Sequence, residues 1–159
     1  MYPKGRINVC NTLSVAKTLS SMFLLRNGVE LNEASMQKFV YLVQRESLLV
    51  NRHVLFHEPF YGWKYGPALY SVQQEYQKPD RFSAIEEEKN CEVRNLLQGV
   101  LERYENESLW NLSEMIHGEL AWQFSRFGVD AAENGNVPLS LRLMQTDANR
   151  ELAFRRTAK

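Results

Sequence analysis

The most constraining feature of the sequence is a stripe of apolar residues at helical spacing. They recur every three or four positions at Val93, Leu96, Leu97, Val100, Leu101 and Tyr104, which is the pattern of a helix that buries one face. Ser83 followed three residues later by Glu86 has the spacing of a capping box. We therefore expect a long helix from Ser83 to about Tyr104, and its buried stripe requires other apolar faces to cover it.

Similar signals on both sides of this segment predict several more helices. Asn11 or Thr12 can cap a first helix that Asn27-Gly28 ends, and Asn32 can cap a second. In the second helix the residues expected to face the core are Met36, Phe39, Val40 and Val43, whereas those expected to point mostly elsewhere are Gln37, Lys38 and Gln44. Further helices are expected over residues 68–77, 109–116, 119–127 and 140–156, with an exposed loop over 130–138.

The pattern changes after Arg52, where bulky residues and Pro59 predict a short β-hairpin or an extended connector near residues 53–63. Tyr65-Gly66-Pro67 is then expected to form a hinge into the third helix, because proline fits the first helical position. The predicted fold class is therefore mainly α: a compact multi-helix single domain over residues 1–159, in which residues 140–159 form a C-terminal helix or tail.

The composition excludes several classes of protein. Lys plus Arg and Asp plus Glu both number 19, so the net charge is zero and a nucleic-acid partner is not expected. Apolar runs are too short for a membrane span or a secretory signal, and this predicts a cytoplasmic protein. Cys10 and Cys91 are expected to be ordinary reduced thiols.

No common catalytic motif is present in the sequence. The nucleophile elbow, the P-loop, the dinucleotide-binding glycine turn and the zinc-protease helix are all missing. His53 and His57 are four residues apart, but they fall in the extended segment and lack two further ligands at a suitable spacing. We therefore predict no enzyme activity, no cofactor and no metal site.

Two aromatic segments stand out. Residues 60–67 read Phe-Tyr-Gly-Trp-Lys-Tyr-Gly-Pro; they predict either an aromatic corner that fixes the connector to the helices or a surface where Trp and Tyr anchor a partner. His117, followed by Trp122, lies between two short predicted helices, where its ring could cap helix carbonyls or donate to a tyrosine.

Three pieces of sequence, taken in order, resemble one known family. They are Met36-Gln37-Lys38-Phe39-Val40-Tyr41, then Trp63-x-Tyr65-Gly66-Pro67, then His117 followed by Trp122. This set resembles the Panacea domain of SocA-like antitoxins, also described as phage-associated GepA-like proteins, over about residues 12–127. The family often has Thr before the histidine and Pro before the second tryptophan, where this chain has Ile116 and Ala121.

The resemblance implies an antitoxin that neutralises a toxin encoded nearby by direct contact. It also implies a variant in which the antitoxin acts as an adaptor that delivers the toxin to a cytosolic unfoldase protease. The residues expected to contact the partner or to form the motif are Gln37, Lys38, Tyr41, Trp63, Tyr65, Gly66, Pro67, His117 and Trp122, with Lys38 and Tyr41 on an exposed face. The alternative is a nucleic-acid-binding autorepressor of phage or toxin–antitoxin origin, for which the only support is a basic N-terminal stretch of Lys4, Arg6, Lys17 and Arg26.

Overall fold

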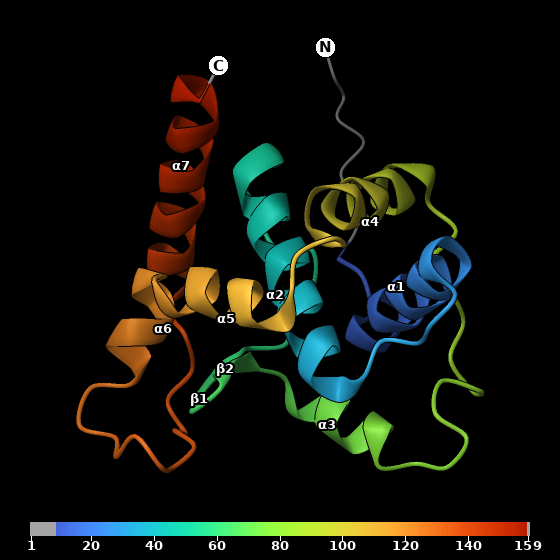
Figure 1. The fold of residues 1–159 in the computed structure, drawn as a ribbon, viewed down its shortest axis with the longest axis horizontal. Coiled ribbons are helices and arrows are strands. Elements are labelled where there is room, and N and C mark those ends of the chain that lie inside the picture. Colours follow the sequence, from blue (N-terminus) through green and yellow to red (C-terminus); the bar gives the residue numbers. More distant parts are fainter. Residues whose placement is uncertain (1–8, 159) are drawn as a thin grey trace.

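The computed structural model describes residues 9–158. Within this range the chain is mainly α-helical, with one small antiparallel hairpin (Figure 1), as predicted. The elements in chain order are α1 (Thr12–Asn27), α2 (Glu33–Val50), β1 (Tyr61–Trp63), β2 (Gly66–Ala68), α3 (Tyr70–Tyr76), α4 (Cys91–Tyr104), α5 (Leu109–His117), α6 (Leu120–Ser125) and α7 (Leu141–Thr157).

Helix α2 lies at the centre of the fold. It contacts α1, α3, α4, α5, α7 and β2, and Figure 1 shows α7 on one side of it and α1 with α4 on the other. The prediction that Gln37, Lys38 and Gln44 point away from the core is wrong, because they are only 7%, 6% and 1% exposed. Other helices and the hairpin surround α2, so its polar side chains must find hydrogen-bond partners inside the protein.

Local capping signals fix the ends of the first two helices. The Asn11 side chain accepts hydrogen bonds from the backbone N–H groups of Leu13 and Ser14 at 3.0 and 3.2 Å. Gly28 ends α1 in the left-handed conformation (φ 75°), and its N–H donates to the Leu24 carbonyl. Asn32 caps α2 through Ser35. These caps confirm the predicted starts of both helices.

The predicted start of the long helix at Ser83 is wrong. Helix α4 begins at Cys91, where the Asn90 side chain caps it. Ser83 instead donates to the Asp80 carboxylate, and the buried Phe82 has a positive φ of 66° that reverses the chain before any helix can start. The Phe82 N–H donates to the buried Glu75 carboxylate at 2.6 Å, which holds this reversal in place. The apolar stripe from Val93 to Tyr104 lies in the core as predicted.

The hairpin lies partly beyond its predicted range. Tyr61 pairs with Ala68 and Trp63 with Gly66, so Lys64 and Tyr65 form the turn. The prediction that Pro67 opens a helix is wrong: Pro67 lies in β2, and α3 begins only at Tyr70. Proline is tolerated there because β2 is an edge strand and the opposite edge of the hairpin, on β1, pairs with residues 135–139.

The C-terminal part follows the predicted order of two short helices, a loop and a last helix. In Figure 1, α5 crosses α2, α6 lies below α7, and α7 runs upward beside α2. In the described range, no helix is long and apolar enough to cross a membrane.

Candidate partner-binding site

The side-chain amide of Gln37 joins α2 to the junction between β2 and α3. Its nitrogen donates to the Leu69 carbonyl at 3.1 Å, and its oxygen accepts from the Leu69 N–H at 2.9 Å. Leu69 is completely buried, so this amide satisfies a backbone N–H that water does not reach and adds a second donor to a carbonyl that also accepts from the Gln73 N–H. Gln37 therefore positions the hairpin from within the protein and has little surface to offer a partner.

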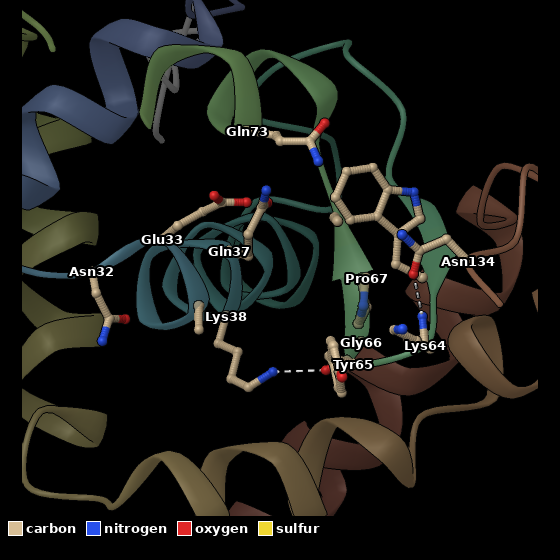
Figure 2. Close-up of a pocket in the computed structure, with 13 residues that line it drawn as sticks. Asn32, Glu33, Gln37, Lys38, Lys64, Tyr65, Gly66, Pro67, Gln73 and Asn134 are labelled. Carbon is tan, nitrogen blue, oxygen red and sulfur yellow. Dashed lines mark hydrogen bonds between the residues drawn. The ribbon is translucent and has the colours of Figure 1, made fainter. Parts of the chain in front are cut away.

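Lys38 joins the same helix to the hairpin turn. Its Nζ donates to the Tyr65 carbonyl at 2.8 Å (Figure 2), and the residue is 6% exposed. Burial lowers the pKa of Lys38 from its ordinary value of 10.5, because desolvation disfavours the charged form. In the described part of the chain, no carboxylate lies within 4.0 Å of this ammonium group, whereas most buried lysines are paired.

Gly66 is required for this arrangement of Lys38 and the hairpin. Its φ of 130° is a conformation that residues with a side chain rarely adopt. A Cβ at this position would lie 3.4 Å from Lys38 Nζ and 4.0 Å from His117 Nε2. Gly66 thus brings the hairpin backbone close to both side chains, which come from α2 and α5.

The two aromatic segments meet as well. The Trp122 indole N–H donates to the Trp63 carbonyl at 2.9 Å, and the Trp122 ring stacks on the His117 ring with centroids 4.5 Å apart and planes at 15°. His117 Nε2 is buried and has no hydrogen-bond partner among the described residues. The expected hydrogen bond from this histidine is therefore not formed at Nε2, and stacking on Trp122 orients the ring instead.

Tyr41 belongs to the core. It is 0% exposed, its ring packs edge-on against Phe60 at 5.3 Å, and its hydroxyl donates to Glu119 at 3.1 Å. Burial, followed by the nearby charge of Glu119, raises the pKa of Tyr41 well above 10.0. The prediction that Tyr41 lies on an exposed face is wrong, because α2 has no exposed side at this residue.

A buried charge network surrounds Tyr41, and the sequence interpretation missed it. Arg45 is 1% exposed; its guanidinium lies 3.2 Å from the Glu119 carboxylate and donates to the Tyr104 hydroxyl at 2.8 Å. Asp147 on α7 accepts from the N–H groups of Leu120 and Ala121, both at 2.9 Å, and so caps α6. The available signal was a charged residue, Arg45, one turn after Tyr41 and close to the apolar run of residues 39–43 in the same helix.

A cavity of about 550 Å³ opens between the start of α2, the hairpin and α3 (Figure 2). Six predicted site residues line it, and so do their neighbours Lys64 and Ala68; the six are Gln37, Lys38, Trp63, Tyr65, Gly66 and Pro67. The other lining residues are Asn32, Glu33, Ala34, Gln73 and Asn134. At its lip the Tyr65 side chain is 73% exposed, so the cavity is the place where the motif reaches the surface.

The family model of SocA-like antitoxins with a Panacea domain matches residues 36–123, which is more than half of the chain. The protein belongs to this family. Searches of curated proteins and of solved structures found no match. The matched range of the Panacea domain contains all nine predicted site residues, from Gln37 to Trp122.

The two departures from the usual Panacea pattern lie in the core. Ile116 and Ala121 are both 0% exposed. The Ala121 N–H donates to Asp147, and a proline at this position could not make that hydrogen bond. Alanine at residue 121 therefore keeps the backbone N–H through which Asp147 of α7 caps α6.

Two of the four basic residues considered for nucleic-acid binding have internal partners. Lys17 Nζ donates to the Ile85 carbonyl, and Arg26 donates to the Glu105 carboxylate, with 2.8 Å between Nε and Oε1. Lys4 and Arg6 lie outside the described residues. Among residues 9–158, no group of three or more His, Cys, Asp and Glu side chains is arranged to hold a metal ion.

Proposed function

We propose that this protein is an antitoxin that neutralises a cognate toxin, encoded nearby, by binding it directly. The observation that carries this proposal is membership of the SocA-like antitoxin family over residues 36–123. The geometry supports it, because two of the three motif segments line a cavity with an exposed aromatic residue, Tyr65, at its lip, and Trp122 of the third donates to the Trp63 carbonyl. Aromatic residues beside a concave surface are frequent anchors for protein partners.

The first test uses the neighbouring open reading frame. We expect its product to stop growth when expressed alone, and co-expression with this protein to restore growth. The two proteins should also elute together in size-exclusion chromatography after mixing. Full growth inhibition during co-expression, without a complex, would contradict the proposal.

A Tyr65→Ala variant tests where the partner binds. Tyr65 is exposed, so its loss should leave the fold intact and weaken neutralisation if the cavity lip is the binding surface. Trp110→Ala is a suitable control, because Trp110 is similarly exposed at 72% but lies on α5 and does not line the cavity.

The adaptor mode is a second form of the same function. In this mode the bound toxin is degraded by a cytosolic unfoldase protease. We expect the half-life of the toxin to shorten when this protein is co-expressed, and the effect to disappear in a strain without the protease. A toxin that is neutralised while its half-life stays constant would exclude the adaptor mode and leave neutralisation by binding.

A further inference from the structure

Helix α2 repeats one polar arrangement twice, at positions seven residues apart. Gln37-Lys38 and Gln44-Arg45 each place a glutamine before a basic residue, and seven residues correspond to about two helical turns, so both pairs point in similar directions from the helix axis. Gln44 acts as Gln37 does: it donates to the Phe56 carbonyl at 2.8 Å and accepts from the Leu55 N–H at 2.7 Å.

The two basic residues differ in their partners. Arg45 is buried and lies 3.2 Å from the Glu119 carboxylate. Lys38 is 94% buried (6% exposed), but its only hydrogen bond among the described residues goes to the neutral Tyr65 carbonyl. An ammonium has three N–H donors, and a buried charge without a counter-ion is unfavourable. Arg45 thus has a carboxylate beside its charge. Lys38 has the cavity beside its charge instead.

We propose that this cavity receives an acidic side chain of the partner polypeptide, whose carboxylate pairs with the Lys38 ammonium. The inference rests on the proposed function in that the ligand belongs to a protein partner. An aspartate or glutamate fits the site because its methylene groups can contact Trp63 and Pro67 while its charge reaches Lys38. Gly66 supports this geometry, since its φ of 130° lets the hairpin backbone pass beside the ammonium in a conformation that residues with a side chain rarely adopt.

Glu33 is the one acidic residue that lines the cavity, so its position decides whether it can be the counter-ion of Lys38. Figure 2 shows its carboxylate on the Gln37 and Gln73 side of the cavity, whereas Lys38 points toward Tyr65. Glu33 therefore does not serve as the counter-ion of Lys38. It does repel an incoming carboxylate, and its removal should strengthen binding of an acidic ligand.

A direct test measures peptide binding to the full chain by NMR titration. The probes are a blocked pentapeptide, acetyl-Ala-Leu-Glu-Leu-Ala-amide, and the same peptide with Gln in place of Glu. We expect the Glu peptide to shift the amide resonances of Tyr65 and Gly66 and to bind at least roughly tenfold more tightly than the Gln peptide. Lys38→Met should remove this preference, and Glu33→Gln should increase it. Lys89→Met removes the same unit charge from an exposed site outside the cavity and should change neither.

Thermal unfolding separates a binding role from a structural one. Replacing a buried, unpaired lysine with methionine should leave the melting temperature unchanged or raise it. A Lys38→Met variant that melts well below the wild type, with unchanged preference for the Glu peptide, would show that Lys38 only holds the hairpin turn. Equal affinity of the wild type for the two peptides, or no binding of the Glu peptide at millimolar concentration, would also overturn the inference.

The growth assay keeps this inference distinct from the proposed function. If the wild type and Lys38→Met neutralise the toxin equally well, the inference fails and the antitoxin function stands. If the wild type does not neutralise the neighbouring gene product but binds the Glu peptide through Lys38, the proposed function fails and the carboxylate site stands.

Discussion

Gln37→Leu tests whether one buried amide holds the hairpin and α3 against α2. The substitution keeps a side chain of similar size and removes both hydrogen bonds to Leu69. Leu69 is 0% exposed, so its N–H would stay buried without a partner, whereas its carbonyl would still accept from the Gln73 N–H at 3.2 Å. The unsatisfied N–H costs about 1 to 3 kcal/mol and the lost hydrogen bond to the carbonyl about 0.5 to 1.5 kcal/mol, so we expect the free energy of unfolding to fall by about 1.5 to 4.5 kcal/mol.

A urea denaturation curve measures this loss. Domains of this size are stable by about 5 to 15 kcal/mol, so the variant should still fold, with a lower urea midpoint and an unchanged slope. Hydrogen exchange measures the local effect on the hairpin–α3 junction. The Leu69 amide should lose more protection from exchange than amides in α4 do. As a control, Gln98→Ala removes an exposed glutamine whose side chain donates to Glu102 on the same helix, and its cost should stay within about 0.5 kcal/mol. A loss below about 1 kcal/mol for Gln37→Leu, with Leu69 still protected, would refute this reasoning.

Three further substitutions test other parts of the structure. Gly66→Ala should lower the free energy of unfolding by about 1 to 3 kcal/mol because φ is 130°; chemical denaturation measures it, and an unchanged midpoint would contradict the required backbone conformation. Asp147→Ala should cost about 2 to 4 kcal/mol, because two N–H groups of α6 lose their acceptor; circular dichroism melting checks this, and wild-type stability would show that the cap is unimportant. Burial raises the pKa of Glu119 above 4.5, so the contribution of this carboxyl to stability is complete below pH 4.5 and declines as the pH rises through the folded-state pKa. The stability of the wild type relative to Glu119→Gln should therefore decrease from pH 4 to pH 7 in urea titrations, and a difference that grows with pH would reverse the assigned direction.

Local signals were enough to predict most of the helices. Asn11, Gly28 and Asn32 act within a few residues of their own helix ends, so the sequence around them contains the needed information. The start of α4 was mispredicted because two capping signals compete there. Ser83 has the spacing of a capping box, but the buried Phe82 and Glu75 fix a chain reversal beside it, and Asn90 becomes the cap.

Tertiary contacts decided the features that the sequence interpretation got wrong. Pro67 suits both the first turn of a helix and an edge strand, and the contact that fixes β2 joins Gln37 to Leu69, which is 32 residues away. Burial of Lys38 follows from the elements packed around α2, and no local pattern contains that information. The motif segments lie together in the fold, because Lys38 donates to the Tyr65 carbonyl and Trp122 donates to the Trp63 carbonyl.

The burial of α2 narrows the region where a partner can bind. Tyr41 and Gln37 are motif residues whose polar atoms already have partners inside the protein, so their role is to hold the hairpin and core in register. Tyr65 is exposed because it occupies the hairpin turn, and Lys38 lines the cavity beside that turn. A family motif therefore combines two kinds of residue here: those that build the scaffold and those that the scaffold presents. Substitutions at the first kind should change stability before binding, and substitutions at the second kind should change binding while the fold remains intact.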